Sequence, residues 1–365
     1  MQTEFSKEQQ LFREVVARAL RDKSPTDAVR ELMASERGYD PAVWQELCGE
    51  VGLSGIHIPE AYGGAGYGQI ELGIVAEEMG RTLYCGPFFA SAVMAASALL
   101  EAATDVQRQT LLPGIASGET IATLVVDDLN DLTRVGSSIL DKDGGLSGVA
   151  PIVLDAHVAT ILIVVAGSDD GGALYSLGPQ DGGVSVEPLE ELDPTRKLCR
   201  VTLDKASGTK LGEVSDAALN RIWDHVSSAL AHEMIGGAQR LLESTVEYTL
   251  VRYQFGRPIG SFQALKHRCA DLLMEIEIAR ALVHHAARCL DAVEGEPYAA
   301  SMAKAAAADA YMSAARAAIQ LRGGIGFTWE NDTHLWFKRA KGSEVLCGTP
   351  TIHRERMMSL LEAAS

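Results

Sequence analysis

The stretch Gln320-Leu321-Arg322-Gly323-Gly324-Ile325-Gly326-Phe327 says more about the fold than any other part of this chain. Paired glycines at a helix end let backbone N–H groups come close to a phosphate, and a neighbouring arginine adds charge-assisted hydrogen bonds. The same glycines also suit an ordinary helix C-cap followed by a loop, which is the simpler interpretation of the spacing alone. The stretch therefore supports two hypotheses, a helix C-cap and a phosphate-binding patch.

A second stretch of interest lies upstream, Arg252-Tyr253-Gln254-Phe255-Gly256-Arg257-Pro258. Its glycine and proline predict the end of one helix before the next begins. Outward from both stretches, apolar periodicity predicts helices over residues 215–250, 261–292, 297–321 and 334–346, with a last helix after Pro350. Long helices joined by short loops form antiparallel bundles. We therefore expect a four-helix bundle over residues 211–365.

The N-terminal part of the chain is also expected to be helical. Leu11, Val16 and Leu20 belong to an apolar stripe with helical period, and Pro41 predicts the first turn of a second helix. Further helices are predicted near Ile70–Arg81 and Ser91–Ala102. We assign these elements to an N-terminal helical domain, residues 1–118.

The middle part of the chain has a different pattern, with short β-branched runs separated by glycine and aspartate clusters. The runs are Ile121–Val126, Val158–Val165 and Val184–Val186. The gaps between them hold turn residues and no amphipathic helices, which argues against parallel βαβ units. We expect a small β domain over residues 119–210.

Composition excludes several classes of protein. The 365 residues are 47% hydrophobic and 22% charged, as in globular proteins, and the net charge of −17 argues against a nucleic-acid or anionic-membrane surface. A local basic pocket for an anionic ligand stays open. The N-terminus does not resemble a signal peptide, and no apolar run is long enough to span a membrane. With six scattered cysteines and no CxxC pair, we expect a reduced, cytoplasmic protein.

The histidines do not predict a metal site. His284 and His285 are adjacent on one helix and point in different directions, so they cannot share an ion. His225 and His232 are seven residues apart, without an accompanying carboxylate motif, and are interpreted as surface or capping residues. GxSxG, HExxH and P-loop patterns do not occur.

Several stretches, all in the same order along the chain, make it similar to one family. They are Pro59–Gly64, Glu77–Gly80, Leu112–Glu119, Arg252–Gly256 with Gln263, and Gln320–Phe327. The chain resembles the acyl-CoA dehydrogenase family over nearly its full length. The resemblance implies an α+β fold with an N-terminal helical domain, a middle β-barrel domain and a C-terminal four-helix bundle that contacts FAD and neighbouring subunits.

The resemblance also implies a reaction and a set of cofactor contacts. The family oxidises acyl-CoA thioesters with FAD: a glutamate removes the α-proton and the β-hydrogen leaves as hydride to the flavin, whose electrons pass to an electron-transfer flavoprotein or a similar acceptor. On this resemblance, Thr349 contacts the cofactor. The residues expected to bind the ADP end of a neighbouring subunit's FAD are Arg252, Phe255, Gln263, Gln320, Gly323 and Gly324.

The usual catalytic base is missing from its position. The family places it in a Tyr-Glu-Gly-Thr segment, which here reads Leu346-Cys347-Gly348-Thr349, so Cys347 replaces the glutamate. A thiol with a pKa of about 8.5 is mostly protonated, and burial raises its pKa further. Some members have the base near the start of the first bundle helix, and those positions fall on Val226 and Ser227, neither of which can abstract a proton.

Two other carboxylates are candidates for an unrecognised base. Glu233 is the first, although it lies about two helical turns, roughly 10 Å, beyond Val226. Glu344 is the second, although it precedes the loop that holds the usual base. Both are less suitable than the family's own positions.

The middle domain also departs from the family pattern. Asp127–Arg134 stands where the family has a Thr-Glu-Pro-x-x-Gly-Ser-Asp run that lines the flavin and the substrate. Ala150–Val153 stands where an aromatic stretch usually covers the flavin ring, and it contains no aromatic residue. The half-site for this chain's own flavin therefore departs from the family, whereas the half that serves a neighbour's flavin matches it.

The resemblance and its departures lead to one hypothesis and two alternatives. The chain is expected to be the non-catalytic subunit of an α2β2 acyl-CoA dehydrogenase, similar to actinobacterial heteromers that act on steroid side-chain CoA esters. The first alternative is a homotetrameric dehydrogenase with an unrecognised base. The second is a non-enzymatic CoA-ester-binding or scaffold protein. Flavin bound by the chain alone would favour the first alternative, and a flavin-free homomer that binds acyl-CoA would favour the second.

Overall fold

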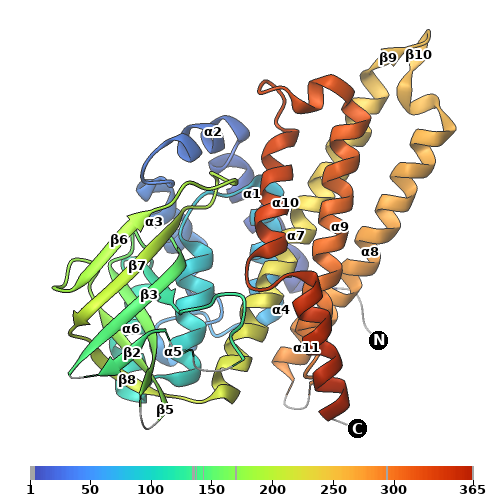
Figure 1. Ribbon diagram of the computed structural model, residues 1–365. Coiled ribbons are helices and arrows are strands. Elements are labelled where there is room, and N and C mark those ends of the chain that lie inside the picture. The colour runs from blue at the N-terminus through green and yellow to red at the C-terminus, as the bar shows by residue number, and fades with distance from the viewer. Residues whose placement is uncertain are drawn as a thin grey trace. The chain divides into compact units, whose positions relative to one another are not determined.

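The computed structural model describes residues 5–133, 136, 138–142, 144–168, 171–292 and 295–363 (Figure 1). Helices precede and follow a β-rich middle part, as the sequence predicted. The helices before the strands are α1 (Lys7–Lys23), α2 (Thr26–Ala34), α3 (Pro41–Glu50), α4 (Gln69–Thr82), α5 (Ala96–Ala102) and α6 (Asp105–Ala116). Those after the strands are α7 (Asp216–Val251), α8 (Gln263–Asp291), α9 (Ala299–Arg322), α10 (Thr333–Val345) and α11 (Pro350–Ala363).

Local sequence explains where the early helices begin. Asp40 precedes α3, its carboxylate accepts a 2.8 Å hydrogen bond from the Ala42 N–H, and Pro41 occupies the first helical position. Ser6 and Gln9 form a capping box at the start of α1. Helices α2 and α6 were not predicted, because α2 is only nine residues long and α6 contains Pro113, which ordinarily marks a helix end.

The predicted helix over Ser91–Ala102 is present but begins differently. Phe89–Ala95 is a π-helical segment, labelled η3, and it continues into α5. All seven residues of η3 are buried. The Oγ of Ser91 accepts a 3.0 Å hydrogen bond from the N–H of Ala122 and thereby joins this segment to the start of the first strand.

The described residues of the middle part form one eight-stranded sheet. Its order is β6-β7-β3-β2-β4-β5-β8, and β1 pairs in parallel with β4. The strands are β1 (Ala122–Val125), β2 (Leu140–Lys142), β3 (Gly145–Leu154), β4 (Ile161–Ser168), β5 (Gly171–Leu177), β6 (Val184–Pro188), β7 (Leu198–Ala206) and β8 (Thr209–Val214). Val125, Leu162, Val164 and Val201 are among the buried residues that form its core.

Only three of these strands were predicted. The β-branched runs correspond to β1, β4 and β6, whereas β3 and β5 begin with glycines, and β7 contains several polar and charged residues. Such strands are stabilised by pairing with their neighbours more than by their own propensity. The described residues between the parallel strands β1 and β4 form β2 and β3, which agrees with the prediction that βαβ units are absent from this region.

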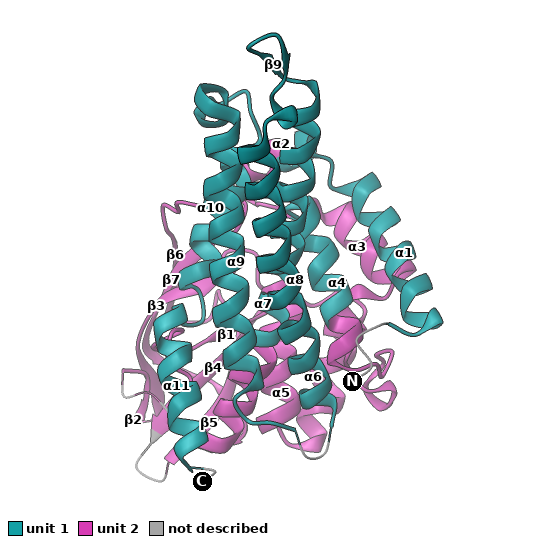
Figure 2. Cartoon of the chain, turned by 90° about the vertical axis from the view of Figure 1, so that its right-hand side faces the viewer, with its two compact units in different colours: residues 1–29, 73–84, 227–365 teal, residues 30–72, 85–226 magenta. Residues whose placement is uncertain are grey.

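The chain divides into two compact units (Figure 2). The first comprises Met1–Val29, Gly73–Tyr84 and Ser227–Ser365, and the second comprises Arg30–Leu72 and Cys85–Val226. The first unit contains α8 to α11 and most of α7, and the second contains the sheet. No helix among the described residues is both long enough and apolar enough to cross a membrane.

Helix α9 is the centre of the helical bundle in the first unit. It packs against α8, α10 and α11. Alanines dominate its buried surface, for example Ala303, Ala307 and Ala314, and these small side chains let three neighbouring helices come close. The apolar side chains of α8 are only partly buried: Leu272 and Ile276 lie in the core, whereas Leu273 is 46% exposed.

Candidate functional site

The connection between α7 and α8 is a two-residue β-hairpin. Strand β9 (Tyr253–Gln254) pairs antiparallel with β10 (Arg257–Pro258), and Phe255 and Gly256 form the turn. Their φ angles are 54° and 77°. A turn with positive φ at both central residues is of type I′, which fits the twist of a hairpin and favours Asn-Gly over Phe-Gly.

Phe255 adopts a left-handed backbone conformation that non-glycine residues disfavour, and its side chain is not buried. Its residue surface is 89% exposed, and a left-handed conformation costs a non-glycine residue roughly 1–2 kcal/mol. The Phe255 ring meets the ring of Phe262 edge to face, with centroids 6.0 Å apart. The guanidinium of Arg257 lies 4.0 Å over the Phe262 ring, so Arg257 is engaged within the hairpin.

The stretch Gln320–Phe327, at the end of α9, contains the predicted helix C-cap. Gly323 has φ 66°, and its N–H donates to the carbonyls of Gln320 and Ile319. A Cβ atom at Gly323 or Gly324 would meet nothing within 4 Å, so the backbone here faces open space. The C-cap interpretation is thus confirmed. The glycine backbone is also accessible to a ligand, as the phosphate hypothesis requires.

Arg322 performs a structural task that the sequence did not reveal. The side chain is only 9% exposed, and its Nη atoms donate to Thr245 Oγ1 at 2.7 Å and to Ser244 Oγ at 2.9 Å. Arg322 therefore joins the end of α9 to the end of α7. Because this guanidinium is already hydrogen-bonded inside the bundle, it is not the arginine that would bind a phosphate at Gly323.

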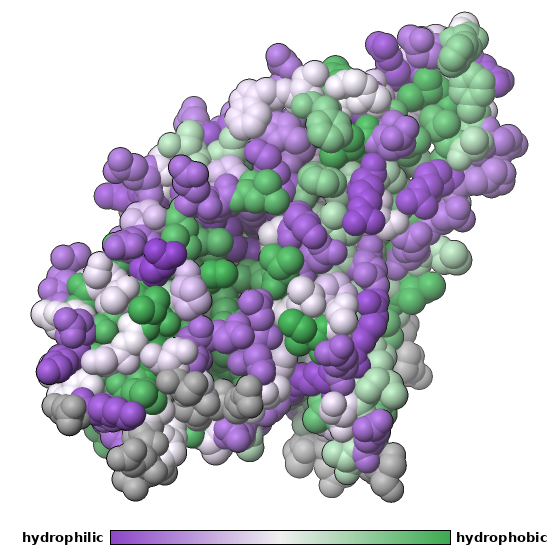
Figure 3. All heavy atoms as spheres, in the orientation of Figure 1, coloured by the Kyte–Doolittle hydropathy of each residue, from purple (hydrophilic) through white to green (hydrophobic). Residues whose placement is uncertain are grey.

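The hairpin and the loop after α9 lie at the same end of the bundle, at the top of Figures 1 and 2. Arg252, Gln263 and Gln320 are exposed there. Hydrophobic residues also gather at this end in the upper right of Figure 3, and the exposed apolar side chains of these segments are Tyr253, Phe255, Ile325, Phe327 and Trp329. The structure thus brings the six residues expected to contact a neighbour's FAD to one exposed end.

The α10–α11 loop, Leu346–Thr349, buries Cys347, which the sequence comparison predicts at the position of the usual base. Cys347 is 0% exposed and has φ 57°. Its carbonyl lies 2.8 Å from Nε2 of His353. Thr349 lies at the start of α11, where its Oγ1 accepts a hydrogen bond from the N–H of Ile352. The thiol of Cys347 therefore lies inside the bundle and has no access to solvent.

Two buried polar side chains, Lys304 and His353, form hydrogen bonds with backbone carbonyls in and beside this loop. Lys304 is fully buried, and its Nζ donates to the carbonyls of Ser343 at 3.0 Å and Gly348 at 3.2 Å. Burial lowers the pKa of His353 to about 3, with a further contribution from the charge of Lys304. The neutral His353 ring donates from Nε2 to the Cys347 carbonyl, so its Nδ1 accepts from the hydroxyl of Ser301 at 3.2 Å.

Both alternative base candidates are engaged in ion pairs. Glu233 is 7% exposed, and its carboxylate lies 2.8 Å from the guanidinium of Arg339. Glu344 pairs with Lys341 on the same helix. Val226 and Ser227 are both fully buried. Glu233 and Glu344 each have a cationic partner, so neither carboxylate is an isolated proton acceptor.

The prediction that His232 is a surface or capping residue is wrong. His232 is 2% exposed, and burial lowers the pKa of its imidazole to about 4. Its Nδ1 lies 2.9 Å from the carbonyl of Ser228. A Cβ atom at Gly73 would come within 2.4 Å of the His232 ring, so this glycine makes room for the histidine. The absence of a side chain at residue 73 could not be linked to His232 from the sequence.

The acidic segment that begins at Asp127, predicted to stand in place of a flavin-lining run, forms hydrogen bonds within itself. Carboxylate oxygens of Asp128 and Asp131 accept hydrogen bonds from the N–H groups of Asn130 and Thr133, which are the local turns typical of aspartate. Asp127 accepts from the N–H of Ser138. Arg134, the last residue of the predicted mismatch, lies outside the described residues.

A cavity of about 750 Å³ lies in the first unit. Its charged lining consists of Arg13, Arg21, Arg81, Arg240 and Arg280 with Glu78, Glu243 and Glu277. The buried carboxylate of Glu77 pairs with both Arg13 and Arg280, and Arg81 pairs with Glu243 at 2.7 Å. Internal carboxylates thus pair with several of these arginines and reduce the positive charge of the cavity.

Comparison with known proteins identifies the family. Residues 6–119 match the acyl-CoA dehydrogenase N-terminal domain and residues 223–361 match the acyl-CoA dehydrogenase C-terminal domain. The chain is 38% identical, over 94% of each sequence, to acyl-CoA dehydrogenase IpdE2 of Mycobacterium tuberculosis. It belongs to the acyl-CoA dehydrogenase family of flavoprotein oxidoreductases, and its fold is the family's fold of helical, β-sheet and helical domains.

Two solved structures are similar over almost their whole length. The Tcur3481-Tcur3483 steroid ACAD G363A variant has a TM-score of 0.89 and 30% identity, over 98% of this chain and 99% of that one. The ChsE4-ChsE5 complex from Mycobacterium tuberculosis has a TM-score of 0.89 and 25% identity, over 99% of both chains.

Proposed function

We propose that this chain is the non-catalytic subunit of a heteromeric, FAD-dependent acyl-CoA dehydrogenase. In an α2β2 assembly it would bind part of the FAD of a paralogous, catalytically complete subunit. The observation on which the proposal rests is the buried cysteine at the position of the usual base. The exposed hairpin end of the bundle supports the second half of the proposal.

Proton abstraction at the α-carbon requires a base that reaches the substrate. Cys347 has no exposed surface. His353 binds the carbonyl of Cys347, and Lys304 binds the carbonyl of the next residue, Gly348. Glu233 is paired with Arg339 and Glu344 with Lys341. These arrangements favour a subunit without its own base.

The exposed end of the bundle fits the ADP portion of a dinucleotide. Gly323 and Gly324 leave backbone open to a ligand, and Arg252 is exposed beside the hairpin. When FAD is bound, its flavin ring accepts the hydride in this family. The residues of this chain would only bind and orient the cofactor: Arg252 as a charged partner of phosphate, Gln263 and Gln320 as hydrogen-bonding groups, and Phe255 as an apolar contact.

The similar structures support the heteromeric assembly and a class of substrate. The Tcur3481-Tcur3483 structure is named for two proteins and is called a steroid ACAD. The other structure is a complex of ChsE4 with ChsE5. By analogy we propose a CoA ester of a steroid side chain as the substrate of the assembled enzyme. The electron acceptor would be an electron-transfer flavoprotein or a similar protein.

The proposal is tested by producing the chain alone and together with a complete paralogue. We expect the chain alone to retain little flavin absorbance and to show no acyl-CoA-dependent reduction of a dye. The co-purified pair should contain flavin that a suitable acyl-CoA bleaches. Stoichiometric flavin in the isolated chain, bleached by an acyl-CoA, would show instead that the chain has an unrecognised base.

A further inference from the structure

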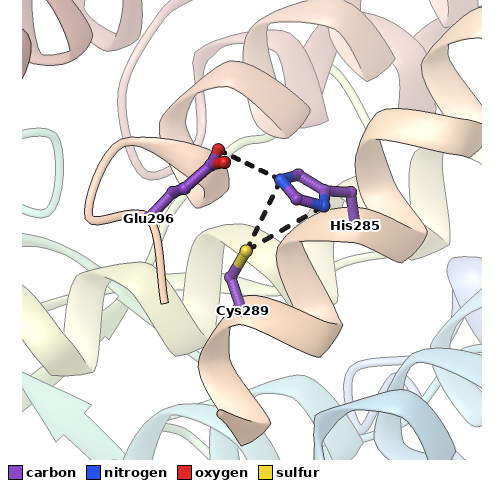
Figure 4. Close-up of side chains that lie close together, drawn as sticks. All are labelled: His285, Cys289 and Glu296. Atoms are coloured by element: carbon purple, nitrogen blue, oxygen red, sulfur yellow. Dashed lines mark hydrogen bonds and ion pairs between the residues drawn. The ribbon is translucent and has the colours of Figure 1, made fainter. Parts of the chain in front are cut away.

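Three side chains that commonly bind transition metals meet at the C-terminal end of α8 (Figure 4). His285 and Cys289 are four residues apart on this helix, so they share one face. Glu296 comes from the connection between α8 and α9 and points back toward them. Gln263, at the other end of α8, is about 40 Å from Cys289 along the helix axis, so this cluster is separate from the proposed cofactor contacts.

Two distances within the cluster are close to those of a metal site, and all three ligand atoms lie within 4.8 Å of one another. Nε2 of His285 lies 3.5 Å from Sγ of Cys289 and 3.1 Å from Oε2 of Glu296. Zinc lies about 2.0–2.1 Å from nitrogen, 2.3 Å from sulfur and 2.0–2.2 Å from carboxylate oxygen. With tetrahedral angles these bonds place the nitrogen about 3.6 Å from the sulfur and about 3.4 Å from the oxygen. The ligand atoms are already near those separations.

The connection that bears Glu296 is held close to the helix. A Cβ atom at Gly295 would come within 2.0 Å of the carbonyl of Cys289, so only glycine permits this approach. Nε2 of His285 also lies within hydrogen-bond distance of the Glu296 carboxylate, 3.1 Å from Oε2. The close approach of Gly295 and the hydrogen bond hold the Glu296 carboxylate in position before a ligand binds. Binding therefore costs this side chain little further conformational freedom.

The imidazole of His285 faces the other two groups with a single nitrogen. Nε2 of His285 faces both Sγ and Oε2, and a neutral imidazole nitrogen carries one proton at most. It can donate fully to one acceptor only. A cation between the three atoms would interact with all of them, and the thiolate and carboxylate would together neutralise its two positive charges.

We propose that His285, Cys289 and Glu296 bind a divalent transition-metal ion of the zinc type, with water as the fourth ligand. A mixed nitrogen, sulfur and oxygen set suits zinc better than magnesium or calcium, which prefer oxygen. The ion would fasten the α8–α9 connection to the end of α8. Because the side chains of His285 and Glu296 are 25% and 48% exposed, the ion can enter from solvent.

Cobalt(II) is a suitable probe, because a thiolate bound to it gives a charge-transfer absorption in the near ultraviolet. The whole chain is purified with a reductant, treated with a chelator, dialysed and titrated with Co²⁺. We expect this absorption to saturate at one ion per chain and to disappear when Zn²⁺ is added. Absence of the absorption in the folded chain would overturn the proposal.

Substitutions identify the ligands. Cys289→Ser should abolish the charge-transfer band, and Glu296→Gln, in an exposed position where folding is not at risk, should weaken Co²⁺ binding on the order of tenfold or more. Cys269→Ser and His267→Gln, elsewhere on α8, are the matched controls and should change neither measurement. A band that survives Cys289→Ser, or binding unchanged by Glu296→Gln, would contradict the assignment. The readout does not depend on flavin, so it is independent of the proposed function.

Discussion

At the scale of single residues, Phe255 combines an unfavourable backbone conformation with an exposed aromatic ring. Asparagine is preferred in this turn position. We expect Phe255→Asn to leave the stability of the isolated chain unchanged or to raise it by up to about 1 kcal/mol. The same substitution should weaken flavin retention in the heteromeric complex, because the apolar contact is lost.

Thermal denaturation of the chain and flavin content of the complex measure the two effects separately. Unchanged or higher stability of the chain, together with loss of flavin from the complex, would support a binding role for the Phe255 ring. If Phe255→Asn destabilises the chain and the complex keeps its flavin, the ring is only a structural part of the hairpin.

Arg252 and Arg257 are two arginines of one hairpin in different surroundings. Arg252 is exposed at the end of α7, whereas Arg257 stacks on the Phe262 ring at 4.0 Å. Hydrogen bonds to charged groups contribute roughly 1.5–3 kcal/mol, so loss of an arginine–phosphate contact weakens binding by about 10–100-fold. We expect Arg252→Ala to have this effect on FAD affinity in the complex, with activity largely restored by excess FAD.

Arg257→Ala is the matched control and should retain flavin. Flavin content after gel filtration and the concentration of FAD that restores half of the activity provide the measurement. Release of flavin by Arg257→Ala and not by Arg252→Ala would reverse the assignment of the two residues.

At the scale of elements, the packing of the α10–α11 loop limits which side chains residue 347 can have. Cys347→Glu would place a carboxylate in a fully buried, left-handed position beside a carbonyl bound by His353. Burial of an uncompensated charge or polar group costs several kcal/mol. We expect this substitution to lower the melting temperature and to create no dehydrogenase activity in the isolated chain.

Cys347→Ala is the control for the loss of the thiol alone and should be far less destabilising. Both variants are compared by thermal denaturation and by acyl-CoA-dependent dye reduction. Dehydrogenation by Cys347→Glu in the absence of a partner would show that the loop can present a base after all.

At the scale of the whole molecule, buried histidines determine the response to acid. Burial lowers the pKa of His57 to about 3, of His232 to about 4 and of His353 to about 3. An unfolded histidine has a pKa near 6.5, so below that pH the unfolded chain binds protons that the folded chain does not. The stabilisation is present above pH 6.5 and is lost as the pH falls, by about 1.4 kcal/mol per pH unit for each group.

We therefore expect the melting temperature to fall markedly between pH 7 and pH 5. His353→Gln, which can still donate to the Cys347 carbonyl and accept from Ser301, should make this decrease shallower. His267→Gln replaces an exposed histidine and serves as the control. A melting temperature that stays constant down to pH 5 would contradict the burial of these neutral imidazoles.

Sequence by itself determined the helical bundle and the family. The predicted helix over residues 297–321 differs from α9, Ala299–Arg322, by two residues at one end and one at the other. Gly323 as a C-cap was also predicted correctly. Such features depend on the chain's own periodicity and on residues a few positions apart, so they can be recognised locally.

Only the tertiary structure decided which polar groups are buried and which meet. Arg322 resembled a phosphate ligand but bonds to Thr245, 77 positions away, and His232 resembled a surface residue but is buried. The meeting of Glu296 with His285 and Cys289 depends on the turn between two helices. Burial and proximity of this kind result from packing between distant segments, and no spacing within one helix or strand specifies them.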